Sequence, residues 1–231
     1  MRKRFLCFRY LFAILLLGLF TLPLGAQSFF GKISWFAEGS ILVFPDDNGP
    51  LSDPTPILPS LGFGVSCPFN NIFRAELTLD FYLTHYGYSD VLNRAIPNAI
   101  ENRTSRVIGS LLAFQAAGYF NVNSFMTIRA FAGPAIDMRI VLVAAGLSDE
   151  LDQMDDIRRQ TDLVRNYFWS KGRWFMPVAG AGLDFKVNPR VKLGLDLRSW
   201  IPVYRLWTDE DLPPIEGWRF GCGIRLSFIK P

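Results

Sequence analysis

The sequence has few of the residues that most often perform chemistry. It contains 1 histidine and 3 cysteines in 231 residues, and nowhere do these two types cluster. A structural metal site needs several such ligands at close spacing, so no metal is predicted. Hydrolytic or acyl-transfer catalysis usually needs a base beside a nucleophile. His85 has Ser89 and Asp90 nearby, but their spacing matches no triad motif, so neither an enzyme nor a cofactor is predicted.

Long apolar runs are also missing, apart from one at the N-terminus. Four basic residues among the first nine precede an apolar segment at 10–20, and Pro23 and Leu24-Gly25-Ala26 follow, with Leu24 bulkier than the residue usual at that place. This pattern predicts a secretory signal peptide at 1–26 and a mature domain at 27–231. An uncleaved anchor is the alternative, although the apolar segment is short for a membrane span.

The net charge gives no support for a nucleic-acid partner. The whole chain has 24 basic and 21 acidic residues, which gives +3. Cleavage after Ala26 would remove four cations and no acid, leaving 20 basic against 21 acidic residues. A mature chain near −1, without a basic surplus, is not expected to bind nucleic acid.

Alternation of apolar and polar residues is the dominant pattern in the remaining chain. Between Arg74 and Thr84, for example, Leu77 and Phe81 fall on one face and Glu76 and Asp80 fall on the other. Side chains of a strand point to opposite faces in turn, so this pattern predicts β-structure. Eight segments show it: Lys32 to Phe44, Ser60 to Phe69, Arg74 to Thr84, Val107 to Phe120, Phe125 to Val143, Trp174 to Val187, Val191 to Ile201 and Trp218 to Phe228.

The connections between these segments are alternately short and long. Three are tight turns containing asparagine, whereas the connections at 45–59, 86–105, 144–173 and 203–217 are long. Bacterial outer-membrane barrels have short periplasmic turns and long extracellular loops. The predicted fold is therefore all-β, an eight-stranded antiparallel transmembrane β-barrel in the bacterial outer membrane.

Glycine and aromatic residues distinguish a membrane barrel from a soluble, lipocalin-like one. Eight glycines fall on the polar faces of the strands, where a narrow lumen would need space for large neighbours. Large aromatic residues fall on the apolar faces, many near the ends of strands, as in the interfacial girdles of membrane barrels. We therefore expect outer-membrane lipids, not water, around the apolar faces.

From Lys32 onward, the chain resembles the small eight-stranded outer-membrane proteins, the group that includes the OmpA transmembrane domain, OmpX and OmpW. The resemblance rests on the alternation and loop pattern described above. It implies a narrow, porin-like barrel at the cell surface.

Charged residues of both signs are predicted to point into the lumen. Because unpaired buried charge is costly, we expect them to form a coupled plug that stiffens the barrel. The predicted members are Arg74, Glu76, Asp80, Arg129, Asp196 and Arg198.

Toward the long loops, the inward positions become apolar. The predicted binding residues of this apolar cup are Val141, Val143, Trp174, Met176 and Trp200. A cup above a charged plug resembles the OmpW-type arrangement, which implies that small hydrophobic solutes enter from outside and leave sideways. Pro134 and Pro177 lack ladder donors at similar depth and could loosen the seam between their strands. A bulge or bend in a closed wall is the other interpretation, and the one that we prefer.

The longest loop has a helical pattern of its own. Leu151, Met154, Ile157, Val164 and Phe168 recur near helical spacing after Ser148, a candidate N-cap. We expect a short helix that packs on the barrel rim or meets a partner.

These patterns predict a narrow facilitator or receptor for small hydrophobic solutes. The first alternative is a structural or adhesin-type barrel that acts through its extracellular loops on a surface partner. A lipid-modifying enzyme is a remote alternative. The sequence does not specify the solute, the partner or the oligomeric state.

Overall fold

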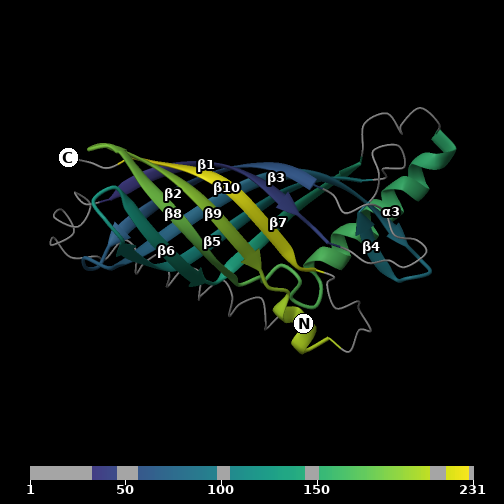
Figure 1. The fold of residues 1–231 in the computed structure, drawn as a ribbon. Coiled ribbons are helices and arrows are strands. Elements are labelled where there is room, and N and C mark those ends of the chain that lie inside the picture. The colour runs from purple at the N-terminus through teal and green to yellow at the C-terminus, as the bar shows by residue number, and fades with distance from the viewer. Residues whose placement is uncertain (1–32, 46–56, 98–104, 144–150, 209–216, 229–231) are drawn as a thin grey trace, which may run out of the picture. The chain divides into compact units, whose positions relative to one another are not determined.

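The computed structural model describes residues 33–45, 57–97, 105–143, 151–208 and 217–228 (Figure 1). The predicted signal peptide at 1–26 and the helix cap predicted at Ser148 lie outside these ranges.

The strands form a closed antiparallel barrel. Neighbouring strands pair along the chain, and the ring closes because β1 pairs with β10 and β3 pairs with β5. β6 and β7 occupy one position in the ring as two halves of an interrupted strand, so eight positions make the wall. The predicted eight-stranded fold is confirmed. Its strands are β1 (Ser34–Val43), β2 (Ile57–Pro68), β3 (Phe73–Ser89), β5 (Ser105–Asn121), β6 (Met126–Gly133), β7 (Ala135–Val143), β8 (Val178–Asn188), β9 (Val191–Trp200) and β10 (Arg219–Phe228).

The outer face of the wall is apolar and the inner face is polar. Charged side chains in the lumen are buried, whereas large apolar side chains on the alternate positions are exposed. This surface would be unfavourable in water, but in lipid it buries the apolar groups and hides the charges. The exposed belt includes Trp35, Ile41, Leu61, Phe63, Phe73, Leu77, Phe81, Leu83, Ile108, Phe114, Ile128, Leu195, Leu197, Phe220, Ile224 and Phe228.

The three short turns use asparagine in the same way. The Asn70 side-chain oxygen accepts hydrogen bonds from the backbone N–H groups of Ile72 and Phe73, at 2.8 and 2.7 Å. Asn123 and Asn188 accept equivalent bonds in the other two turns. A side chain that mimics a backbone turn favours a tight reversal, so these connections stay short. We call this end of the barrel the short-turn end and the other the long-loop end.

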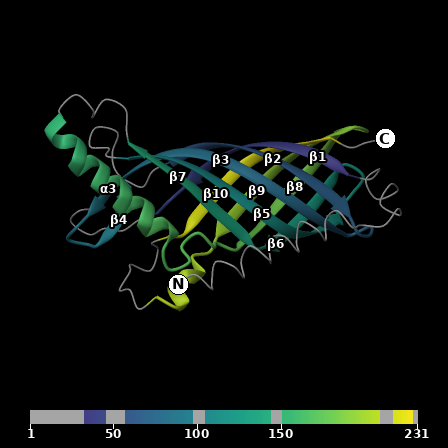
Figure 2. The ribbon, with the colours of Figure 1, turned by 180° about the vertical axis from the view of Figure 1, so that it is seen from behind.

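At the long-loop end, the strands β3, β5 and β7 continue past the apolar belt and carry a helix. β3 extends to Ser89 and pairs with β4 (Arg94–Pro97), a strand that the sequence pattern did not predict. α3 (Leu151–Trp169) packs on β3, β4, β5 and β7, as Figures 1 and 2 show from opposite sides. We call α3, β4 and the outer part of β3 the platform. The predicted loop helix is thereby confirmed. Among the described residues, no helix has the length and apolar character needed to span a bilayer.

Two predicted strands differ from those observed. The segment from Phe125 to Val143 is interrupted at Pro134, which separates β6 from β7. The segment predicted from Trp174 begins only at Val178, after Pro177. Proline has no N–H for the ladder, and it interrupts regular pairing in both places.

Candidate functional site

Arg129 is the centre of a charged network inside the barrel. Its Nη1 donates to Glu76 Oε2 at 2.6 Å, and its Nη2 donates to Asp196. Arg225 donates to both carboxylate oxygens of Glu76, at 2.9 and 3.0 Å, and the Tyr119 hydroxyl donates to the same carboxylate. Arg129 and Glu76 have no solvent-exposed surface. Removing either partner would therefore leave a charge in a dry interior.

Arg198 extends this network across the lumen. It pairs with Asp80 at 3.1 Å, with Asp196 at 3.3 Å, and with Glu38. Because Asp196 also pairs with Arg129, the ion pairs form one connected set that joins five strands, β1, β3, β6, β9 and β10. We call this set the plug: Glu38, Glu76, Asp80, Arg129, Asp196, Arg198 and Arg225.

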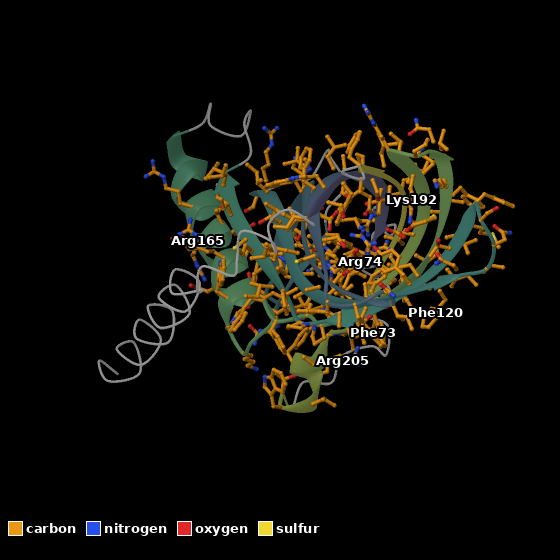
Figure 3. The ribbon with its side chains drawn as sticks, turned by 90° about the vertical axis from the view of Figure 1, so that its left-hand side faces the viewer. Phe73, Arg74, Phe120, Arg165, Lys192 and Arg205 are labelled. Carbon is orange, nitrogen blue, oxygen red and sulfur yellow. The ribbon has the colours of Figure 1, made fainter. Side chains whose placement is uncertain are left out.

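Arg74 is the predicted plug residue that the ion pairs do not include. Its guanidinium lies 4.7 Å from the centre of the Tyr119 ring, nearer the short-turn end. With Lys192 it lines a small cavity of about 40 Å³. Figure 3 looks onto this end and labels both residues toward the lumen, with Phe73 and Phe120 on the outer side. The structure thus joins the other five predicted residues and leaves Arg74 near the short-turn end, outside the ion pairs.

The five residues predicted for an apolar cup are not gathered into one pocket. Met176 and Trp200 are buried in a packed apolar layer above the plug, with Leu42, Leu111, Phe131 and Val178. Val141 belongs to a second cluster that packs against α3. Val143 is 36 % exposed, and Trp174 is partly buried beside Phe175.

The space above the apolar layer is small. The cavity at the long-loop end has a volume of about 40 Å³, and Met176 is the one predicted cup residue that lines it. A water molecule needs roughly 10–15 Å³ by this measure, so there is room for about three. Ligand pockets for larger organic molecules are closer to several hundred Å³. In the part of the chain that the structure describes, side chains of the wall and of α3 fill this end of the lumen, and the binding role of the five cup residues stays a prediction.

Pro134 and Pro177 lie opposite each other, but their missing donors do not face the seam between them. The pairs on either side of the two prolines keep a single register. Pro134 O accepts a bond from Phe114 N at 3.0 Å, and Pro177 O accepts one from Ile201 N at 2.8 Å. The N–H and C=O positions of a strand residue point to the same neighbouring strand. The donor that Pro134 lacks would therefore face Phe114 of β5, and the donor that Pro177 lacks would face Ile201, just after β9.

The seam itself keeps its backbone bonds up to Asp137. Met176 N donates to Ala135 O at 3.0 Å, and Asp137 N donates to Trp174 O at 2.8 Å. The direction of these backbone groups therefore favours a bend in a closed wall over a seam that the two prolines loosen. No β7–β8 ladder is found beyond this point in the described residues.

Sequence reasoning missed a second charged cluster at the long-loop end. Asp137 pairs there with Arg139 and Arg219, and it accepts a hydrogen bond from Tyr82 at 2.8 Å. A signal was available, since Arg219 lies between the apolar-face residues Trp218 and Phe220 and must point inward. Its pairing with Asp137 depends on the closure of the barrel.

The other residues examined for chemistry remain separate. His85 lies on β3 opposite Arg106. Cys67 on β2 and Cys222 on β10 are free thiols. Within the described ranges, no group of three or more histidine, cysteine, aspartate or glutamate residues could hold a metal ion.

Comparison with known proteins gives similarity at the level of the fold. Neither a protein-family model nor a curated protein matches the sequence. Among solved structures, Neisserial surface protein A is 13 % identical, with 86 % of this chain and 97 % of that chain covered and a TM-score of 0.49. Ail of Yersinia pestis is 10 % identical, with 86 % and 97 % covered and a TM-score of 0.44. OprG from Pseudomonas aeruginosa is 10 % identical, with 86 % and 93 % covered and a TM-score of 0.43.

The molecule's own surfaces decide where it resides. A closed wall satisfies its own backbone hydrogen bonds, an apolar belt surrounds it, and ion pairs fill its lumen. Only a membrane makes this distribution favourable, and closed barrels with short turns at one end are the spanning structures of the bacterial outer membrane. The chain is an integral outer-membrane β-barrel of the small, eight-stranded kind.

Proposed function

We propose that this barrel is a closed membrane anchor whose working surface is the platform at its long-loop end. The plug is the observation that supports this role. Its ion pairs connect five of the eight wall positions, and its side chains are buried. An eight-stranded barrel encloses little more than its own side chains, so such a plug leaves no room for a water-filled path.

The platform is held firmly enough to present a defined surface. Phe168 of α3 meets Tyr86 of β3 edge to face at 4.8 Å, and Val164 is fully buried beneath the helix. Thr161 shares a hydrogen bond of 3.0 Å with Ser105 of β5. The opposite face of α3 is exposed and carries Arg158, Arg159, Asp162, Arg165, Asn166 and Trp169. This face is the surface that we assign to a partner.

Two measurements test the proposal. In planar bilayers the purified barrel should show no steady conductance, and a stable open channel would contradict a closed anchor. Cells that display the barrel should attach to at least one member of a panel of immobilised polysaccharides and proteins. Reversing the charge of Arg158, Arg159 and Arg165 should abolish that attachment while outer-membrane assembly is unchanged. Attachment that survives the charge reversal would show that the exposed face of α3 does not bind the partner.

A facilitator for small hydrophobic solutes is the second candidate, and one observation favours it. Within the described residues, β7 and β8 form no ladder beyond Asp137, so a solute leaving sideways there would break no described strand pair. Trp174→Arg would place a charge beside this point, with exposed Trp207→Arg as its control. On this reading, uptake of a hydrophobic solute by reconstituted vesicles falls in the first variant only. Equal uptake in both variants and in empty vesicles would exclude the facilitator.

A further inference from the structure

A small cavity lies at the long-loop end, between the barrel mouth and the platform. Its volume is about 40 Å³, and its wall comes from segments that are far apart in the sequence. α3 contributes Tyr167 and Phe168, β7 contributes Arg139, and β10 contributes Arg219. The remaining wall is mainly aromatic and contains a third guanidinium, that of Arg173, so the described charges that face this space are positive.

These two guanidinium groups share one carboxylate. Arg139 Nε donates to Asp137 Oδ2 at 2.5 Å, and Arg219 Nη1 pairs with the same oxygen. The Tyr82 hydroxyl already donates to the other carboxylate oxygen. Asp137 has no exposed side-chain surface, and the side chains of Arg139 and Arg219 are at most 9 % exposed. Among the residues that the structure describes, these two buried positive charges therefore share one buried negative charge.

Both guanidinium groups have donors beyond those that Asp137 uses. Asp137 accepts from Nε of Arg139 and pairs with Nη1 of Arg219, which also donates to the Tyr82 hydroxyl at 3.3 Å. The planar faces are occupied, because Arg139 stacks at 3.9 Å on the Phe168 ring and Arg219 at 4.5 Å on the Phe44 ring. A guanidinium stacked in this way presents its N–H edge, which matches the oxygen pairs of carboxylates and phosphates.

We propose that this cavity binds one anionic group, a carboxylate, phosphate or sulfate, that arrives from the long-loop side. The room for about three water molecules suits the oxygens of such a group. Arg173, a third buried guanidinium in the wall, adds positive potential from the turn after α3. The inference goes beyond the proposed function, because it concerns the cavity beneath the platform and holds whatever the outer face of α3 contacts.

A purely structural role for the same cluster makes a different prediction. If Arg139, Arg219 and Asp137 only tie β7 to β10, then removing the carboxylate weakens the cluster and creates no ligand affinity. If the cavity binds an anion, Asp137 competes with that anion for the same donors. Neutralising Asp137 should then increase the affinity.

The test is a calorimetric titration of the whole barrel in detergent micelles with inorganic phosphate, at constant ionic strength in chloride. We expect one saturable site per chain. Arg139→Gln and Arg219→Gln should each weaken binding by at least about tenfold, since each removes charge-assisted hydrogen bonds. Arg165→Gln is the matched control, because Arg165 is exposed on α3 and paired with Asp162, and it should bind as the unmodified protein does.

Asp137→Asn gives the result with the opposite sign. It keeps the side-chain shape but removes the competing charge, so phosphate should bind more tightly, by about tenfold or more. A gel-shift assay on unboiled samples checks that each variant is folded. Titration with phenyl phosphate separates two sources of the group: equal affinity indicates a free small anion, and tighter binding indicates the end of a larger molecule. No saturable phosphate binding in either the unmodified protein or Asp137→Asn would overturn the proposal.

Discussion

The short-turn half of the lumen and the long-loop half hold their buried charge differently. In the plug, the four carboxylates Glu38, Glu76, Asp80 and Asp196 face the guanidinium groups of Arg129, Arg198 and Arg225. At the long-loop end, Asp137 is the one described carboxylate between Arg139 and Arg219, and aromatic rings cover the guanidinium faces.

The difference follows from position in the membrane. Within the wall, each charge of the plug is far from water and is paired with at least one opposite charge, because an uncompensated charge in a dry interior is very unfavourable. Near the mouth, a positive surplus is tolerable when rings and a shared carboxylate stabilise it. The ion pairs of the plug therefore make the barrel rigid, whereas the proposed anion would bind Arg139 and Arg219 at the long-loop end.

The largest expected effect is at the centre of the plug. Arg129→Met would leave Glu76 and Asp196 with fewer partners in a dry lumen, and we expect a loss of about 3–5 kcal/mol in the free energy of unfolding. Urea unfolding in micelles, followed by gel shift, measures it. Arg74→Met is the control, because Arg74 has no ion pair among the described residues and should cost less than about 1 kcal/mol. If both variants lost the same free energy of unfolding, the plug would be no more important for stability than Arg74 near the short-turn end.

The next effect should be confined to the platform. Phe168→Ala removes a buried ring that packs against Tyr86, and we expect the local stability of α3 to fall by about 3 kcal/mol. Hydrogen exchange of α3 amides should accelerate while exchange in the barrel strands is unchanged. Asn166→Ala, at an exposed position, serves as the control. If the strands of the plug also lose protection, the two regions unfold as one unit.

Overpacking in the lumen should have a smaller effect. A Cβ placed on Gly109 would lie 1.9 Å from the Tyr82 ring, whereas one placed on Gly39 would meet nothing within 4 Å. Gly109→Ala should therefore destabilise the barrel by about 1–3 kcal/mol, because the Tyr82 ring must move away from Asp137. Gly39→Ala should be nearly neutral. Thermal unfolding in the same detergent compares the pair, and a neutral Gly109→Ala would show that the lumen can adapt.

The smallest expected effect concerns the prolines. Pro134→Ala restores a donor toward Phe114 of β5, which should stabilise that pairing by about 1 kcal/mol. Protection should rise for amides shared by β5 and β6, and should stay the same across the seam to β8. If protection rose only for amides shared by β6 and β8, the backbone groups of Pro134 would not face β5, contrary to the hydrogen bond from Phe114.

Local alternation was enough to predict the wall. The inward or outward position of Glu76, Leu77 and Phe81 follows from a period of two residues, which needs no knowledge of the rest of the chain. The loop helix was predictable for the same reason, from the spacing of Ile157, Val164 and Phe168. A bulge or bend at Pro134 and Pro177 was predictable from the missing N–H of proline, but the exact ends of the strands at Gly133 and Val178 were not.

What the tertiary structure alone decided is which of these residues meet. Arg198 and Glu38 are 160 residues apart, and Arg129 and Glu76 are 53 apart, so their pairing depends on the register and closure of the barrel. The direction of each proline's backbone groups likewise depends on which neighbour its position in the ladder faces. The apolar cup is filled because packing volume is a property of all the walls together, whereas alternation along one strand reports only which way each side chain points.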